Sequence, residues 1–217
     1  MHPSAERLAV FIYFVNEREN IRRNRAAGGR APWTKDAILQ RFHFCNIRRE
    51  DDRGTKEIRQ VAKDLVVPLG ELPEFYTMAR MFNKADSAYD YWAKGIQHLR
   101  DKREDGITIF NTAYVVSTCG KSMDKLDYVE GVVTKVANSL VSCTSCASAF
   151  DDLRKIDGLG SFMAGQIVAD LKNDQYLADA WDFDTFAVMG PGSKKGLDFL
   201  FGYGTTEKNF TQRLEDL

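Results

Sequence analysis

The chain has 217 residues, of which 44% are hydrophobic and 28% charged, a composition that is ordinary for a soluble globular protein. This length allows one sizeable domain or two small ones. The formal net charge of −1 excludes a global basic field for nucleic acid, so any contact with DNA has to come from local basic patches.

The N-terminal stretch, residues 4–25, is expected to form an amphipathic helix, because apolar residues recur there at helical spacing: Leu8, Phe11, Ile12 and Val15. A loop is expected over residues 26–32, where Gly and Pro cluster. Thr34 is expected to cap a short helix that carries Ile38 and Leu39.

Residues 41–55 (RFHFCNIRREDDRGT) combine aromatic rings, a thiol, an amide and both signs of charge, without an amphipathic period. Such a mixture favours the wall of a functional site over a core element. The alternative is a surface loop whose Arg and Asp side chains pair with each other, and exposed pairs of this kind stabilise little.

The middle of the chain predicts four further helices from the spacing of their apolar residues. They carry, in order, Ile58, Val61, Ala62 and Leu65 (capped by Thr55); Phe75, Met78, Ala79 and Phe82; Tyr89, Trp92, Ile96 and Leu99; and Leu126, Val129, Val133, Val136 and Leu140. Residues 107–116 are rich in β-branched side chains, which fits a strand or, in a helical chain, a buried helix.

Residues 153–171 (LRKIDGLGSFMAGQIVADL) predict a helix-hairpin-helix, two short helices joined by a Gly-x-Gly turn. Gly158 and Gly160 are expected to make the turn, because glycine adopts positive φ without a Cβ clash, and Ser161 is expected to cap the second helix. Free N–H groups at such a turn can hold a DNA phosphate, so Gly158, Gly160, Ser161 and Lys155 are the candidate DNA contacts. The alternative is an ordinary αα-hairpin in a helical core.

The C-terminal part contains GPGSKKG at 190–196, which is expected to be a glycine-rich loop that offers N–H groups and ammonium charge to phosphate oxygens. It lacks the spacing of a Walker A loop, and the alternative is a helix-terminating turn with solvated lysines. Phe210, Leu214 and Leu217 predict a final docking helix. Without repeats or an obvious linker, we expect a single all-α domain over residues 1–217.

Basic clusters and cysteines complete the inventory of polar features. The clusters are Arg22, Arg23, Arg25 and Arg30; Arg48, Arg49 and Arg53; and Lys194 with Lys195, and each alone is explained well by a solvated helix face. The four cysteines, with no signal peptide and no long apolar run, favour free thiols in a reducing cytoplasm and no membrane partner. Cys143 and Cys146 form a lone C-x-x-C pair, for which zinc would need two of His2, His43 and His98, so no metal site is expected.

The hairpin, followed by Asp184-Thr185, resembles the helix-hairpin-helix DNA glycosylases, in which an Asp-Thr pair begins a helix downstream of the hairpin. This resemblance implies a glycosylase-like helical architecture, with Asp184 as the catalytic acid. Two features depart from that family. Phe162 stands where bifunctional members carry a lysine nucleophile, and the four-cysteine iron–sulfur signature is missing.

A narrower resemblance covers nearly the whole chain through motifs that occur in order: PWTKDAIL at 32–39, RFHFCNIRREDD at 41–52, NTAY at 111–114, the hairpin, and GPGSKKGL at 190–197. Together they are similar to the α-glutamyl/putrescinyl thymine pyrophosphorylase group, the amino acid:DNA transferases of bacteriophages. That group is related to the helical domain attached to some 5-hydroxymethyluracil DNA kinases. The resemblance implies that an amine displaces pyrophosphate from 5-pyrophosphoryloxymethyl-deoxyuridine in DNA, in the cytoplasm of the host cell. The amine would belong to an amino acid such as glycine or glutamate, or to putrescine.

This reaction needs a base for the amine and cations for the leaving group. Asp184, Glu50 and Asp51 are the candidate bases. The first candidates for binding the pyrophosphate are Ser193, Lys194 and Lys195, and Arg48 and Arg49 are expected to form a second clamp. Asn46 and Tyr114 are expected to be further substrate contacts. Direct displacement is one route. The other uses a Cys45 thiolate that adds to the uracil ring, and the alternative for Cys45 is a buried small hydrophobe.

The expected partners are DNA with a modified thymine and an amino acid or polyamine. No cofactor is expected, and a divalent metal ion accompanying the pyrophosphate stays open. Two other functions remain alternatives: a DNA glycosylase that uses Asp184, and a non-catalytic DNA-binding module that assists a 5-hydroxymethyluracil DNA kinase.

Overall fold

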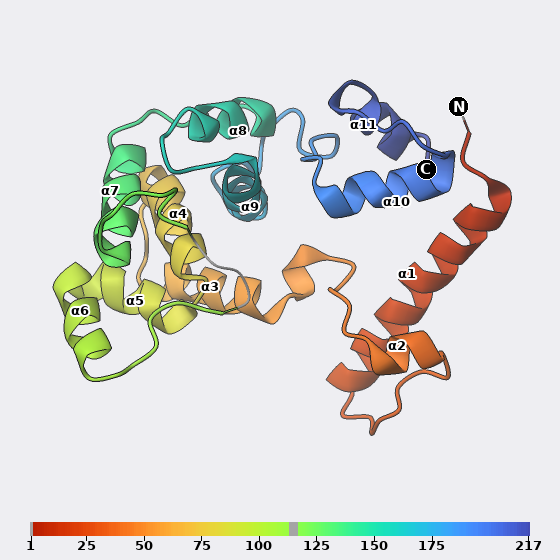
Figure 1. Ribbon diagram of the computed structural model, residues 1–217, viewed down its shortest axis with the longest axis horizontal. Helices are drawn as coiled ribbons and strands as arrows, with labels where there is room; N and C mark the ends of the chain where they lie inside the picture. The colour runs from red at the N-terminus through yellow and green to blue at the C-terminus, as the bar shows by residue number, and fades with distance from the viewer. Residues whose placement is uncertain (1, 113–116) are drawn as a thin grey trace. The chain divides into compact units, whose positions relative to one another are not determined.

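The computed structural model describes residues 2–112 and 117–217 of the chain, and these residues are helical or irregular, with no strand. The prediction of an all-α protein is therefore confirmed. The helices, shown in Figure 1, are α1 Ala5–Ala26, α2 Ala37–Arg41, α3 Arg53–Asp64, α4 Leu72–Phe82, α5 Ala85–Lys94, α6 Ile96–Glu104, α7 Lys125–Ala137, α8 Cys146–Arg154, α9 Ser161–Lys172, α10 Pro191–Phe201 and α11 Glu207–Glu215. Short 3-10 helices occupy η1 Arg49–Asp51 and η2 Leu69–Glu71.

The chain divides into two compact units. The terminal unit comprises residues up to Asp52 together with Met189–Leu217, and the central unit comprises Arg53–Val188. The single domain predicted over residues 1–217 stays a prediction. In the part of the chain that the structure describes, no helix is long and apolar enough to cross a membrane.

Helix α4 is the core of the central unit, because every residue from Leu72 to Phe82 except Glu74 is buried. The apolar spacing predicted this helix correctly. It packs against α5, α7 and α9, so three neighbouring helices cover its surface (Figure 1). A helix enclosed on all sides has to be apolar all round, as α4 nearly is.

A buried ion pair ties α4 to α9. The Arg80 guanidinium in α4 donates to both carboxylate oxygens of Asp170 in α9, and one of these contacts measures 2.7 Å. Arg80 also donates to the Thr55 hydroxyl in α3 at 3.0 Å. Thr55 was predicted to cap its helix, and this is wrong: α3 begins at Arg53, so Thr55 lies inside the helix and serves the buried arginine.

Two further predictions in the central unit need correction. The helix expected to run from Tyr89 to Leu99 is two helices, because Gly95 adopts φ +83° and ends α5 before α6 begins. Residues 107–112 form neither strand nor helix, although Ile109 is buried, and residues 113–116 lie outside the described residues. Helix α7 forms as predicted but ends before Leu140, whose side chain is exposed.

In the terminal unit, α1 forms as predicted, but its expected apolar face is not buried. Phe11 and Ile12 are 39% and 50% exposed, whereas the buried residues of α1 are Arg18 and Ile21. The N-terminal end of α1 contacts α10, with Ser4 N donating to Leu200 O at 3.0 Å. Its C-terminal half contacts the segment around α2 (Figure 1).

Helix α2 is capped by Asp36, whose carboxylate accepts the N–H groups of Ile38 and Leu39 at 2.8 and 2.9 Å. The prediction that Thr34 caps this helix is wrong, because the buried Thr34 hydroxyl donates to Glu17 of α1 at 2.5 Å instead. The predicted docking helix is present as α11, where buried Phe210 packs in one cluster with Leu197, Leu200 and Phe201 of α10.

Candidate functional site

The helix-hairpin-helix forms as predicted, from α8, the turn at 155–160 and α9. Gly158 adopts φ +108°, and a Cβ atom there would lie 2.5 Å from Val132 Cγ2 and 3.0 Å from the Tyr128 hydroxyl oxygen of α7. Gly158 is therefore required both by its backbone conformation and by the close approach of α7.

Gly160 plays a different part from the one predicted. Its φ is −80°, and a Cβ atom there would meet nothing within 4 Å, so the turn needs only one of its two glycines. Gly160 is the N-cap of α9 and Ser161 is its first helical residue, so the prediction of Ser161 as the cap is wrong. Helix α9 therefore begins directly at the turn. The free N–H groups at a helix N-terminus attract anions.

Basic side chains surround the hairpin turn. Asp157 in the turn accepts from Lys121 Nζ at 2.6 Å and from Lys135 Nζ at 2.9 Å, and these two bonds lower the pKa of its carboxyl to about 2. Lys155, predicted as a DNA contact, pairs with Asp152 at 2.8 Å and is exposed. Lys135 and Lys155 line an open cleft of about 610 Å³ beside the turn. Sequence reasoning missed Lys121 and Lys135, because only the fold brings them to Asp157.

Asp184 lies exposed in a run of turns over residues 181–185, and α9 is followed by no helix before α10. The Asp-Thr pair thus begins no helix here, unlike the pair of the glycosylases. The buried acid of this segment is Asp182, which accepts the N–H groups of Cys146 and Ala147 at 2.7 and 2.9 Å and so caps α8. Nothing in the sequence indicates that Asp182 rather than Asp184 is the buried acid.

Cys146 is buried, which raises the pKa of its thiol to about 11, whereas Cys143 is exposed. The two halves of the C-x-x-C pair therefore differ in environment. Within residues 2–112 and 117–217, no group of three or more His, Cys, Asp or Glu side chains is arranged to hold a metal ion.

In the terminal unit, α1 holds the mixed segment 42–51 through two arginines. Arg18 donates from Nε to Phe44 O at 3.2 Å and from Nη2 to Asn46 Oδ1 at 2.5 Å. Asn46 in turn donates to Asp51 O at 2.9 Å, and the Asp51 carboxylate pairs with Arg22 at 3.2 Å. Two of the predicted site residues, Asn46 and Asp51, are thus fixed to each other and to α1.

The other predicted residues of this segment are more open. Cys45 and Arg48 are exposed, and Arg49 and Glu50 are half-buried in η1. The alternative in which Cys45 is a buried hydrophobe is therefore wrong. Arg18 binds the Phe44 carbonyl and the Asn46 side chain, and these two residues flank Cys45 in the sequence.

Arg18 is a functional candidate that sequence reasoning missed. It is 7% exposed, and its Nη1 atom has no hydrogen-bond partner in the structure. Burial, followed by the nearby charge of Arg25, lowers the pKa of Arg18. A charged arginine in a helix of ordinary composition resembles a surface residue in sequence, so only its burial identifies it.

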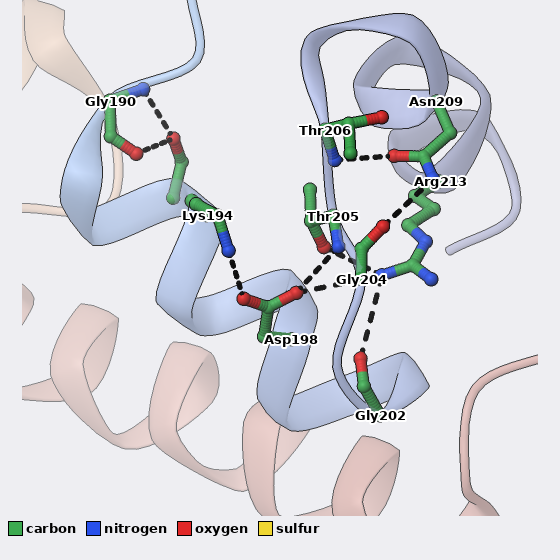
Figure 2. Close-up of polar contacts among 10 residues, drawn as sticks. Gly190, Lys194, Asp198, Gly202, Gly204, Thr205, Thr206, Asn209 and Arg213 are labelled. Atoms are coloured by element: carbon green, nitrogen blue, oxygen red, sulfur yellow. Dashed lines mark hydrogen bonds and ion pairs between the residues drawn. The ribbon is translucent and has the colours of Figure 1, made fainter.

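The prediction of a glycine-rich loop at residues 190–196 is wrong, because these residues form the N-cap and the first turns of α10. Pro191 occupies the first helical turn, where its fixed φ suits a helix, and Ser193 exchanges hydrogen bonds of 2.9 and 3.0 Å with the Gly190 backbone. As Figure 2 shows, Lys194 points toward Asp198 one turn later and pairs with it at 2.5 Å, whereas Lys195 is exposed.

Asp198 joins α10 to the loop before α11. It accepts the Thr205 N–H at 2.7 Å, while Arg213 of α11 donates to the Thr205 hydroxyl at 2.6 Å (Figure 2). The bonds from Lys194 and Thr205 hold the pKa of the Asp198 carboxyl well below its usual range. Ser193 and Lys194 therefore have structural partners. Tyr114, predicted as a substrate contact, lies outside the described residues.

The chain matches the family described as 5-hmdU DNA kinase, helical domain, over residues 5–215. It is also similar to the 5-hmdU DNA kinase of Bacillus phage SP10, with 25% identity over 228 aligned residues. That similarity covers 88% of this chain but only 36% of the kinase. The relationship to the 5-hydroxymethyluracil DNA kinase helical domain, which the motifs predicted, is confirmed. No solved structure matches the chain, so the glycosylase-like architecture stays a prediction.

Proposed function

The chain belongs to the family of 5-hmdU DNA kinase helical domains, and we propose on that basis that it modifies thymine in phage DNA. More specifically, we propose a transferase. It replaces the pyrophosphate of 5-pyrophosphoryloxymethyl-deoxyuridine in DNA with the amine of an amino acid or of putrescine.

The observation that carries this proposal is the anchoring of segment 42–51 on α1. Hydrogen bonds link Arg18 to Asn46 and Asn46 to the backbone of Asp51. Cys45 directly precedes Asn46 in the sequence. A cation and an amide held by a rigid helix are part of the equipment that a transfer to an activated carbon needs.

The proposed reaction balances as a substitution. The C–N bond forms at the 5-methylene carbon, the C–O bond breaks, and pyrophosphate leaves with the electron pair. The proton lost by the attacking amine passes to a carboxylate. Glu50 is our first candidate because the Asp51 carboxylate already pairs with Arg22, and Asp184 stays a candidate from the sequence alone. Full turnover by Cys45→Ser would exclude the covalent route and leave direct displacement.

The hairpin is proposed to hold the DNA backbone. The N-terminus of α9, with Gly158, Gly160 and Ser161, adjoins a cleft that Lys135 and Lys155 line, and phosphate contacts of this kind position DNA without reading its sequence. The modified base would be extruded, because the 5-substituent is hard to reach within the base stack.

The leaving pyrophosphate is proposed to meet the start of α10, with Arg48 and Arg49 as a second clamp. A phosphate would have to compete with Asp198 for Lys194, whereas Lys195 is exposed. We therefore expect Lys195→Ala to lower turnover more than Lys194→Ala does, while both keep the affinity for DNA. Equal losses of turnover and DNA affinity would assign these lysines to the DNA backbone.

A second candidate function is a non-catalytic DNA-binding module. It is favoured by one observation, that the matched family is described as the helical domain of a 5-hmdU DNA kinase. The deciding experiment is nucleoside mass spectrometry on DNA that carries 5-pyrophosphoryloxymethyluracil, after incubation with the protein and single amines, with Mg²⁺ or with EDTA.

The three outcomes of that experiment are distinct. A nucleoside with the mass of an amine adduct supports the transferase and names the amine. Free base with abasic sites would indicate a glycosylase. Unchanged nucleosides throughout would refute the transferase and leave the binding module.

A further inference from the structure

Two adjoining cavities lie in the terminal unit, between α1 and the segment that follows it. The smaller has a volume of about 20 Å³ and includes Arg18, Phe42 and His43 in its lining. The larger has a volume of about 160 Å³ and is walled mainly by residues 31–34 and 39–40. Both share Ile21, Arg25 and Leu39, so they are two parts of one cleft.

The charge of this cleft is one-sided. Arg18, which lines the smaller cavity, is more than nine-tenths buried, and its Nη1 atom has no hydrogen-bond partner, which is costly for a guanidinium. Arg25 stacks over the Trp33 ring, 4.2 Å from its centroid, and lines both cavities. No Asp or Glu is among the described residues that line either one. Arg18 and Arg25 therefore offer two guanidinium groups to an anion, while the Glu17 carboxylate behind the wall residue Thr34 accepts the hydroxyl of Thr34.

We propose that this cleft binds the carboxylate of a small amino acid, with Arg18 and Arg25 holding the carboxylate oxygens. The inference rests on the proposed transferase function, and it selects an amino acid over a polyamine as the amine donor.

Size favours a carboxylate over a diphosphate. A cavity of about 20 Å³ holds roughly one water-sized group, because a single water needs about 10–15 Å³ on this measure. A flat carboxylate can direct one oxygen to Arg18 there and the other toward Arg25, whereas a diphosphate is far larger. The cavity of about 160 Å³ then receives the rest of the amino acid against Pro32 and Trp33.

The test is an NMR titration of the full ¹⁵N-labelled chain without DNA, in which the Trp33 Nε1–H resonance reports on the cleft. The probes are glycine, glutamate, acetate, ethanolamine, putrescine and pyrophosphate. We expect glycine and acetate to shift this resonance, and ethanolamine and putrescine to leave it unchanged. Arg18→Gln should weaken glycine binding by about 10- to 100-fold, as expected for the loss of one charge-assisted hydrogen bond.

Two more variants keep the test decisive if Arg18→Gln does not fold. Arg25→Gln removes the second cation at the surface of the cleft and should also weaken glycine binding. Arg23→Gln is the matched control, because Arg23 lies on the same helix, is exposed and lines neither cavity. It should bind glycine like the wild type.

Two results would overturn the proposal: glycine binding that survives in Arg25→Gln and in folded Arg18→Gln, or a response to pyrophosphate alone. Because the titration contains no DNA, it separates this proposal from the proposed function. Carboxylate binding without any nucleoside product would refute the transferase and keep the site. Nucleoside product with putrescine but not with glycine would keep the transferase and refute the site.

Discussion

Gly158 offers a sharp test of the hairpin, because its replacement by Ala meets two obstacles. At φ +108° a side chain costs about 1–2 kcal/mol. The new Cβ would also lie 2.5 Å from Val132 Cγ2, in a helix whose buried valines cannot move freely. Such overpacking costs about 1–3 kcal/mol. We therefore expect Gly158→Ala to lower the free energy of unfolding by about 2–5 kcal/mol.

The assay is urea unfolding followed by far-UV circular dichroism, with two control variants. Gly160→Ala has open space around its Cβ and should cost less than about 1 kcal/mol, since Ala is only a poorer N-cap than Gly. Gly131→Ala, in the interior of α7 with nothing nearby, should stabilise by about 0.4–1 kcal/mol. If Gly158→Ala is no more destabilising than Gly160→Ala, the described contact between the turn and α7 is wrong.

Three other predictions follow from burial and charge. Asp170→Ala leaves Arg80 buried without its carboxylate and should cost about 3–5 kcal/mol in urea unfolding, and the double change Arg80→Met with Asp170→Leu should recover part of this loss. Iodoacetamide at a pH of about 8 should label the three exposed cysteines and spare Cys146, as counted by mass spectrometry. The contribution of Asp157 to stability should be complete above its unfolded pKa and decline as the pH falls from about 4 to about 2, and Asp157→Asn should abolish this dependence.

The sequence by itself determined the features that depend on local spacing. Helices α4, α7 and α9 were predicted because apolar residues at helical intervals have to face one core. The hairpin was predicted because two glycines between such stripes mark a turn. The start of α10 had a local signal too, the Pro191 that suits the first turn of a helix, but its glycines were given more weight.

The tertiary structure alone decided which polar side chains meet. Thr55, a predicted cap, serves Arg80, and Asp182 rather than Asp184 is the buried acid, because each contact joins residues far apart in the chain. Arg18 shows the physical reason most clearly. In sequence it is one cation on a helix. Only the packing of residues 42–46 over α1 removes it from water, which leaves one guanidinium nitrogen without a hydrogen-bond partner.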